Sequence, residues 1–361
     1  MALPQEKIRA ILNEVIDPNT GKGLQDSGEI AKVLVLGSDV SVTVELGYPA
    51  KTAAPQIEAA AKAALEQAGF PGASVEAKQA IRAHKVQPLL RVLPGVKNII
   101  AVSSGKGGVG KSTVAANFAL ALAAEGAKVG VLDADIYGPS QPAMLGVTGA
   151  PACEDGESMT PKESMGLQVN SIGLLISPDD PVIWRGPMVS SALQQLLFQT
   201  KWKDLDYLVI DMPPGTGDVQ LTLTQQVPVT GAVVVTTPQD IATLDARKGL
   251  MMFRKVNVPV LGVVENMALF RCPCCGHLER IFGKGGAKQM SEQYGVPVLG
   301  SLPLDTKIRE EADSGRPTVA SEPESETAAI FREIARKAAA AIASLPLDHS
   351  SSIPKITPVK A

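Results

Sequence analysis

A glycine-rich segment over residues 105–113 has the residue types and spacing of a phosphate-binding loop. Its residues are, in order, Gly105, Lys106, Gly107, Gly108, Val109, Gly110, Lys111, Ser112 and Thr113. The segment satisfies G-x-x-x-x-G-K-[ST], follows an apolar run at residues 99–102 and precedes a helical pattern. Its glycines let backbone N–H groups converge on phosphate, at the positive end of the helix dipole. We expect Lys111 to reach the β- and γ-phosphates of ATP and the Ser112 hydroxyl to ligate Mg²⁺.

Carboxylates follow two further apolar runs. Asp133 and Asp135 come directly after residues 129–132, and Asp211 ends the run at residues 207–210. A buried strand that ends in aspartate is typical of the Walker B motif, whose carboxylate holds Mg²⁺ through water. A single aspartate in such a place also suits a helix N-cap. Together with the phosphate loop, these residues indicate a phosphoryl-transfer site.

The cysteines of the chain are clustered. Three of the four fall within four positions, at Cys272, Cys274 and Cys275. Cys272 and Cys275 form a C-x-x-C pair, which fits half a zinc site, a redox dithiol or two ligands of an iron–sulfur cluster. No second C-x-x-C occurs in the sequence. Two chains in a symmetric dimer supply four thiolates, the number that a [4Fe–4S] cluster takes.

The phosphate loop resembles that of the deviant Walker A ATPases related to MinD and ParA. Those proteins carry a signature lysine after the first glycine, which is the position of Lys106 in this chain. The resemblance implies that Lys106 contacts ATP bound by a partner subunit and stabilises charge in the transition state. It also implies that Asp135 orients the attacking water, that Asn266 recognises the adenine edge and that Pro303 lines the base pocket.

Further segments narrow the resemblance to the Mrp/ApbC family of iron–sulfur cluster carrier ATPases. They are residues 133–140, 184–188, 211–218, 265–267 and 272–276, in the order of that family. The match covers about residues 95–340 and implies slow ATP hydrolysis coupled to cluster loading or transfer. It further implies a homodimer that shares a [4Fe–4S] cluster between Cys272 and Cys275 of its two copies. Apo iron–sulfur proteins would receive the cluster, and a cluster assembly scaffold would donate it. Cys274 lies at a variable position of the family motif and is not assigned as a ligand.

The pattern of apolar runs predicts the elements that position these residues. From about residue 97, short runs bounded by turn residues alternate with helical patterns. The predicted strands lie at residues 99–102, 129–132, 207–210, 232–235, 258–264 and 298–302. We therefore predict a doubly wound, mostly parallel α/β sheet, a P-loop NTPase domain over residues 97–345, with ligands at the carboxyl ends of its strands.

The first 82 residues predict a separate small α+β domain. Helices are expected over residues 4–15 and 54–68, and strands over residues 30–36, 40–46 and 73–77. This part looks like the iron–sulfur-assembly-type domain that precedes the ATPase in many bacterial members. It contains no cysteine, so we do not expect it to bind a cluster independently. Residues 83–96 are predicted to be a linker, and residues 346–361 a flexible tail.

Composition excludes several classes of protein. The chain has 361 residues, 45% of them apolar, which is enough for a folded protein of two domains. Its net charge of −3 disfavours nucleic acid as a partner. No apolar stretch approaches the roughly 18 residues needed to cross a bilayer, and the first residues do not form a signal peptide. We expect a cytoplasmic protein without membrane or nucleic-acid partners.

Two alternatives keep the nucleotide site but change the function. One is a nucleotide-dependent positioning switch of the ParA/MinD type, which would need a basic DNA-facing patch or an amphipathic terminal helix. The other is an ATPase in which the C-x-x-C pair forms a structural zinc site across a dimer.

Overall fold

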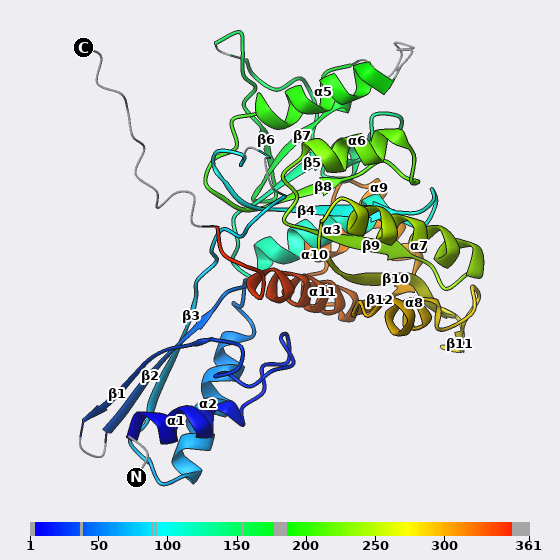
Figure 1. Ribbon diagram of the computed structural model, residues 1–361. Helices are drawn as coiled ribbons and strands as arrows, with labels where there is room; N and C mark the ends of the chain where they lie inside the picture. Colours follow the sequence, from blue (N-terminus) through cyan, green and yellow to red (C-terminus); the bar gives the residue numbers. More distant parts are fainter. Residues whose placement is uncertain are drawn as a thin grey trace, which may run out of the picture.

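The computed structural model describes residues 4–36, 39–87, 90, 92–153, 155–176 and 186–348 (Figure 1). In chain order, the elements are α1 (Pro4–Asn13), β1 (Ile30–Leu36), β2 (Asp39–Leu46), α2 (Ala54–Gln67), β3 (Ser74–Gln79), β4 (Val96–Ser104), α3 (Lys111–Ala124), β5 (Val129–Asp133), α4 (Gln141–Met144), β6 (Lys162–Ser164), β7 (Leu167–Ser171), the 3-10 helix η1 (Ile172–Leu174), α5 (Gly186–Phe198), β8 (Leu205–Asp211), α6 (Asp218–Gln226), β9 (Gly231–Thr236), α7 (Asp240–Lys255), β10 (Val260–Arg271), β11 (Leu278–Glu279), α8 (Gly286–Tyr294), β12 (Val298–Leu304), α9 (Thr306–Asp313), α10 (Thr318–Ser321) and α11 (Glu326–Ala343). Most of the predicted tail, residues 349–361, lies outside the described residues.

The first three strands form a small sheet of their own, in the order β1-β2-β3. β1 runs antiparallel to β2, and β2 runs parallel to β3. Buried and more exposed positions alternate along β2, because successive side chains of a strand point to opposite faces. α1 packs against β1 and α2 against β3, which completes the small α+β unit expected at the N-terminus (Figure 1).

The remaining strands form a second, mostly parallel sheet. In the described part of the chain its order is β11-β10-β9-β4-β8-β5-β7-β6, with β12 also paired to β10. Only the β10/β11 and β6/β7 pairs are antiparallel. β5, β8 and β9 are buried along their whole length, as expected for strands with helices on both faces. The predicted doubly wound α/β fold is confirmed.

Helices cover both faces of this sheet. The side chains of Ile100 and Val102 in β4 belong to a core that includes α3 and α11. Those of Ile99 and Ala101 belong to a core that includes α5, α6, α7 and α8. None of the helices in the described residues is long and apolar enough to span a membrane.

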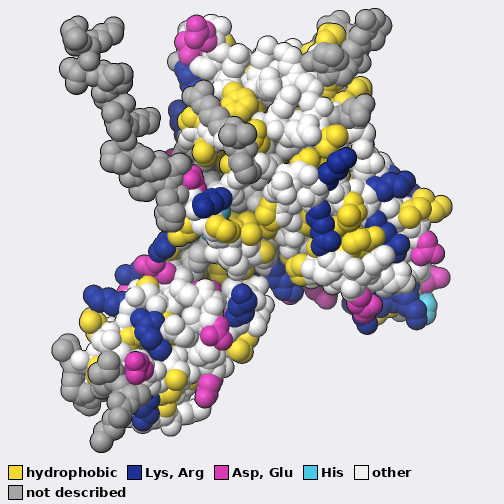
Figure 2. Space-filling model, viewed as in Figure 1, with side chains coloured by type: hydrophobic (Ala, Val, Ile, Leu, Met, Phe, Trp, Pro, Cys, Tyr) yellow, Lys and Arg dark blue, Asp and Glu magenta, His cyan; other side chains and the backbone are white. Residues whose placement is uncertain are grey.

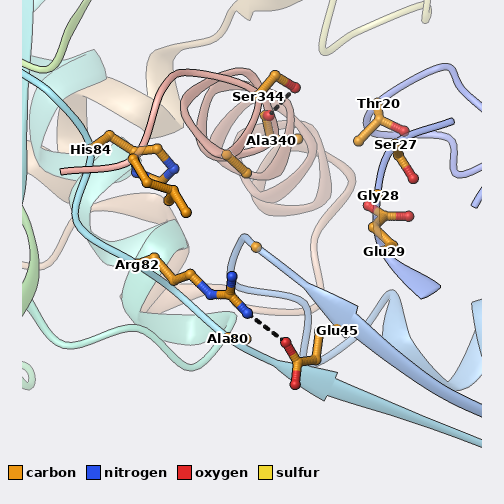
Figure 3. Close-up of a pocket in the computed structure, with 13 residues that line it drawn as sticks. Thr20, Ser27, Gly28, Glu29, Glu45, Ala80, Arg82, His84, Ala340 and Ser344 are labelled. Carbon is orange, nitrogen blue, oxygen red and sulfur yellow. Dashed lines mark hydrogen bonds and ion pairs between the residues drawn. The ribbon is translucent and has the colours of Figure 1, made fainter. Parts of the chain in front are cut away.

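The small domain meets the end of α11 at a boundary that contains a cavity of about 140 Å³ (Figure 3). Glu29 of the small domain, His84 and Ser344 line this cavity. Arg82 pairs with Glu45 at 2.7 Å beside it. Burial and, next, the charge of Asp17 raise the pKa of Glu29 to about 8. The boundary thus holds an acid that keeps its proton at neutral pH.

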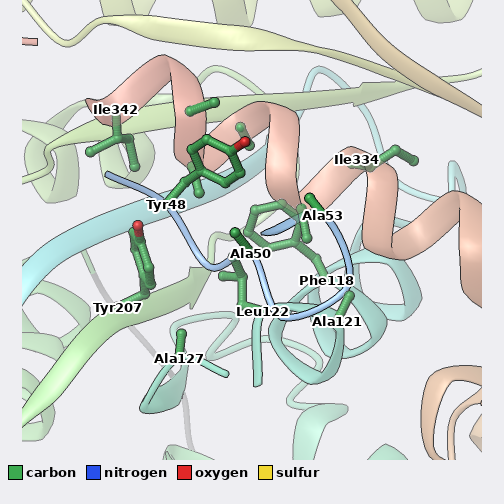
Figure 4. Close-up of a cluster of buried hydrophobic side chains, with 14 of the residues drawn as sticks. Tyr48, Ala50, Ala53, Phe118, Ala121, Leu122, Ala127, Tyr207, Ile334 and Ile342 are labelled. Carbon is green, nitrogen blue, oxygen red and sulfur yellow. The ribbon is translucent and has the colours of Figure 1, made fainter. Parts of the chain in front are cut away.

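Apolar packing also crosses this boundary. Tyr48 and Ala50 of the small domain lie in one cluster with Phe118 and Leu122 of α3 (Figure 4). Tyr48, Phe118 and Leu122 are all completely buried. Gly47 lies so close to α11 that an added Cβ would be 2.8 Å from the Cβ of Ala343. The small domain is therefore part of one continuous core with α3 and α11.

Candidate functional site

The phosphate loop connects the end of β4 to the start of α3. Gly108 and Gly110 have φ angles of 83° and 80°, in the left-handed region that favours glycine. A Cβ at Gly110 would lie 2.3 Å from Nδ2 of Asn266, and one at Gly105 would lie 2.1 Å from the carbonyl carbon of Asp245. Glycine is therefore required at these positions by conformation and by close packing.

A cavity of about 230 Å³ opens over this loop. The predicted loop residues that line it are Lys106, Gly107, Gly108, Gly110, Lys111, Ser112 and Thr113. Asp135 and Pro214 line it from the segments that follow β5 and β8. Val109 is instead buried, with its carbonyl oxygen turned to Asn266. The sheet thus brings the loop and the predicted catalytic carboxylate Asp135 together.

Lys111 is the charged centre of the site. Its side chain is 6% exposed, and its ammonium contacts the carboxylate of Asp211. The same Nζ lies 3.1 Å from the Ser112 hydroxyl and 3.8 Å from Oδ2 of Asp135. Asp211 is fully buried at the end of β8. The oxygens of Ser112 and Asp211 thus share one cation, and hard oxygen donors of this kind suit Mg²⁺.

The surroundings of Asp133 and Asp135 raise the pKa of each carboxyl group above its ordinary value. Burial and, next, the charge of Asp211 raise the pKa of Asp133 to about 7. Burial also raises the pKa of Asp135, while the nearby Lys111 lowers it. The backbone N–H groups of Asp135 and Gln141 donate to the two oxygens of Asp133 at 3.1 and 3.0 Å. Asp133 therefore anchors the turn that presents Asp135.

Two buried glutamines join these segments and were not predicted. Nε2 of Gln141 donates to Oδ2 of Asp211 at 2.9 Å and to the carbonyl oxygen of Ser112 at 3.0 Å. Nε2 of Gln220 donates to the Ser103 hydroxyl and the Pro213 carbonyl oxygen, both at 2.8 Å. Among the residues that the structure describes, Oε1 of each glutamine is buried and has no hydrogen-bond partner. A glutamine directly after the 133–140 segment was the only signal for Gln141 in the sequence.

Lys106 lies at the rim of the cavity and is half-buried. Its carbonyl oxygen accepts a hydrogen bond from the Ser104 hydroxyl at 2.9 Å, which fixes the backbone of the loop. In the part of the chain that the structure describes, its ammonium makes no ion pair. The predicted contact of Lys106 with a partner subunit remains a prediction.

The two residues expected around the base lie in different places. Nδ2 of Asn266 donates to the Val109 carbonyl oxygen at 2.9 Å, so Asn266 contacts the phosphate loop. Pro303 lines a neighbouring cavity of about 330 Å³ between β10, β12 and α11. Arg271 and Glu326 are also part of its wall. Asn266 does not line this cavity, and a shared role in base recognition remains a prediction.

The C-x-x-C pair lies in the hairpin between β10 and β11. The N–H of Cys272 donates to the His277 carbonyl oxygen at 2.9 Å, and the N–H of Gly276 donates back to Cys272 at 2.8 Å. Gly276 has a φ of 71°, which the turn requires. Cys274 and Cys275 are exposed, and Cys272 is half-buried. We call residues 271–279 the cysteine hairpin.

The hairpin favours the thiolate of Cys272. Backbone N–H groups of Cys275 and then Cys274, together with the Cys275 thiol, lower the pKa of Cys272. Over the described ranges, no group of three or more His, Cys, Asp or Glu side chains is placed to hold a metal ion. The Cys275 thiol thus lies within hydrogen-bonding reach of Cys272, and a shared metal centre remains a prediction.

Some predicted segments cannot be placed. Trp184 and Arg185 lie outside the described residues, as does the side chain of Asp218. The backbone of the 211–218 segment is held to the loop, because the N–H of Gly215 donates to the Ser104 carbonyl oxygen at 3.0 Å.

Comparison with known families fits this geometry. Residues 95–339 match the family described as NUBPL iron-transfer P-loop NTPase. The chain belongs to this family. Residues 5–79 match a second family, described as iron-sulfur cluster assembly protein. The resemblance drawn from the motifs is therefore confirmed.

Similar proteins cover most of the chain. The iron-sulfur cluster carrier protein of Pseudomonas fragi is 60% identical over 269 residues, which is 74% of this chain and 94% of the relative. The protein of the same name from Haemophilus influenzae is 51% identical over 339 residues, 92% of this chain and 90% of the relative.

Two solved structures similar to this chain are a nucleotide-binding protein and a MinD protein. A nucleotide-binding protein from Archaeoglobus fulgidus, in complex with ADP, is 39% identical with a TM-score of 0.57, over 64% of this chain and 90% of that one. The cell division ATPase MinD of Pyrococcus furiosus is 26% identical with a TM-score of 0.51, over 66% of this chain and 97% of that one.

Proposed function

We propose that this chain is an ATP-hydrolysing carrier that binds a labile [4Fe–4S] cluster in a homodimer and passes it to apo-proteins. The observation that carries the proposal is the path of β10. Along this single strand, Asn266 contacts the phosphate loop at Val109, and Cys272 follows directly after the last residue, Arg271. A change in the loop therefore has a short covalent route to the cysteine hairpin.

The nucleotide half of the proposal rests on the residues around Lys111. Backbone N–H groups of the loop and the Lys111 ammonium bind the phosphates of ATP. Hydrolysis joins a water oxygen to the γ-phosphorus and breaks the bond to the β–γ bridging oxygen, which releases ADP and phosphate. Asp135 orients this water, and Lys106 of a partner copy stabilises the developing charge. Ser112 and Asp211 would hold Mg²⁺, which neutralises phosphate charge when bound.

The cluster is cargo. Each chain contributes Cys272 and Cys275, and two copies together supply the four thiolates that a [4Fe–4S] cluster takes. The lowered pKa of Cys272 supports this role, because the thiolate is the form that ligates metal. A cluster assembly scaffold would load the dimer, and apo iron–sulfur proteins would unload it. Slow turnover fits a cycle in which each hydrolysis accompanies one loading or transfer event.

Anaerobic reconstitution tests the cluster assignment. We expect about four iron per dimer and charge-transfer absorbance in the visible range. The double variant Cys272→Ala/Cys275→Ala should lose both, whereas Cys274→Ser is the matched control and should keep them. Retention of the full cluster by the double variant would overturn the proposal. Stoichiometric zinc that resists replacement by iron under anaerobic conditions would support a structural zinc site instead.

A further inference from the structure

The cavity between the small domain and the end of α11 has a buried carboxylate oxygen without a partner in its wall. Glu29 lines this cavity of about 140 Å³. The residue is 5% exposed, and within the described part of the chain its Oε2 has no hydrogen-bond partner. The backbone of Glu29 is fixed, because its carbonyl oxygen accepts from the N–H of Glu45 at 2.7 Å. An unpaired polar atom beside a cavity suits a site that a ligand completes.

The walls of this cavity favour positive charge. The last turn of α11 reaches it with Ala340 and Ala343, followed by Ser344. The C-terminal end of a helix carries partial negative charge and attracts cations. Figure 3 shows Glu29 to one side of this helix end and His84 to the other. A ligand in the cavity would thus meet a carboxyl group and the negative end of α11 together.

The lining holds little positive charge of its own. Among the described residues of the lining, Arg82 is the one Lys or Arg, and its guanidinium pairs with Glu45 at 2.7 Å. Burial lowers the pKa of His84, so its imidazole is neutral at pH 7. In Figure 2, Lys or Arg and Asp or Glu side chains are interspersed over the visible face of the small domain. Selection of a cation would therefore come from the cavity itself.

The cavity also has an apolar side. Ala80, Ala340, Ala343 and Leu347 line it together with Gly47. Its volume of about 140 Å³ is several times the space that one water needs. A bare metal ion would leave these apolar side chains without contact, whereas a short alkyl chain would pack against them. The lining therefore suits a ligand with one cationic end and one apolar end.

We propose that this cavity binds a primary alkylammonium ion, whose ammonium pairs with the Glu29 carboxylate and whose chain packs against Ala343 and Leu347. The site is separate from the nucleotide site and from the cysteine hairpin, and it does not depend on the carrier function. Binding transfers the proton of Glu29 to solvent, so one proton is released for each cation bound. Two sources offer this chemistry, namely a free amine and the lysine side chain of another protein.

Titration of the full-length chain with n-butylammonium chloride tests the proposal. The amide NMR signals of Gly28 and Gly47, which line the cavity, report binding. 1-Butanol has the same chain without the charge and is the control ligand. Glu29→Gln should weaken binding roughly tenfold or more, because a neutral amide replaces the ionic partner. Glu76→Gln, at an exposed pair on β3, should bind like the wild type.

A second variant acts on the opposite wall. Ser344→Leu adds volume at the end of α11 without a change of charge and should also weaken binding. The Ser344 hydroxyl bonds within its own helix end, to the Ala340 carbonyl oxygen at 3.2 Å, so its loss leaves the rest of the lining in place.

The pH dependence identifies Glu29 as the partner. Other charged or titratable side chains around it come from the small domain and the segment that follows it, and α11 adds none to the described lining; they are Asp17, Glu45, Tyr48, Arg82 and His84. Wild-type affinity should rise about tenfold from pH 7 to pH 9, because Glu29, with a pKa of about 8, must lose its proton to pair with the ligand. The ligand keeps its charge over this range, as lysine does. Glu29→Gln should lack this rise.

Three outcomes would overturn the proposal. They are equal binding of 1-butanol, equal NMR shifts with potassium chloride at the same concentrations, and unchanged binding by Glu29→Gln. Nα-acetyl-lysine methylamide distinguishes the two sources. Binding of this compound as tightly as n-butylammonium would support a lysine side chain as the natural ligand. Binding of n-butylammonium alone would support a free amine.

Discussion

The Glu125 carboxylate lies 2.6 Å from the Arg336 guanidinium, and this pair joins the end of the phosphate-loop helix α3 to α11. Glu125 is fully buried directly after α3. The same carboxylate accepts hydrogen bonds from the backbone N–H and hydroxyl of Thr52, at 3.0 and 2.6 Å. One side chain thus connects the nucleotide-binding helix, the last helix and the small N-terminal domain.

We expect Glu125→Gln to lower the free energy of unfolding by about 1–3 kcal/mol, because Arg336 loses its ionic partner in a largely buried place. Urea denaturation measures the change. Glu66→Gln is the control, since Glu66 pairs with Lys62 on the surface, and it should change stability by less than about 0.5 kcal/mol. Equal effects of the two substitutions would contradict the structural role of Glu125.

The two lysines of the loop should have separable roles. Lys111→Ala should abolish nucleotide binding, because the Lys111 ammonium is the cation buried among the oxygens of the site. Lys106→Ala should reduce turnover more than affinity, because Lys106 is proposed to act on ATP of the partner copy. Calorimetric titration with ADP and phosphate-release assays measure the two quantities. Equal loss of affinity in both variants would argue against action across the dimer.

Gln141 should act as a positioning residue for Asp211. Gln141→Leu keeps a similar volume but removes the hydrogen bonds to Asp211 and Ser112. We expect the Mg²⁺ concentration for half-maximal nucleotide binding to rise about five- to tenfold, equivalent to about 1 kcal/mol. Gln195→Leu on the exposed side of α5 is the control. An unchanged Mg²⁺ dependence with lowered thermal stability would mean that Gln141 serves only packing.

Glu29 should make stability depend on pH. Its pKa is about 8 in the folded protein and 4.5 as the ordinary value. Between these values the unfolded chain has released the proton that the folded chain still holds, so the free energy of unfolding falls as the pH rises through this window. Glu29→Gln cannot ionise and should gain stability relative to the wild type between pH 5 and pH 9.

The gain from Glu29→Gln should amount to a few kcal/mol, at about 1.4 kcal/mol for each unit of pKa difference. Urea denaturation at pH 5, 7 and 9 measures it. Glu76→Gln, at an exposed pair with Lys78, is the control and should run parallel to the wild type. A parallel curve for Glu29→Gln as well would show that Glu29 ionises normally in the folded protein.

Local patterns predicted most of the fold. The predicted strands at residues 129–132 and 207–210 lie within β5 and β8, because strands buried on both faces are continuous apolar runs. The short strands β6 and β11 were not predicted. They have only three and two residues, whose side chains are exposed or half-buried, and so they leave no apolar pattern in the sequence. β10 continues through Asn266 to Arg271, beyond its apolar run, because it also pairs with β11 and β12.

Those parts of the site that lie within one short sequence motif could be predicted from the sequence. The loop and Asp211 follow from motifs that a phosphate and its cation require. Gln141 and Glu125 do not, because their partners lie far away in sequence. Gln141 meets Asp211 across 70 residues, and Glu125 meets Arg336 across 211. Such contacts depend on the order of strands in the sheet, which equally apolar strands leave undetermined.

The continuous core between the small domain and α3 has a consequence for dissection of the chain. A fragment that starts near residue 95 would uncover Phe118 and Leu122, which are wholly buried, and would remove Thr52 from the Glu125 carboxylate. We therefore expect such a fragment to aggregate, unless the apolar residues that become exposed on α3 are replaced by polar ones. The roles of the two domains are thus better studied with substitutions at their boundary than with fragments cut between them.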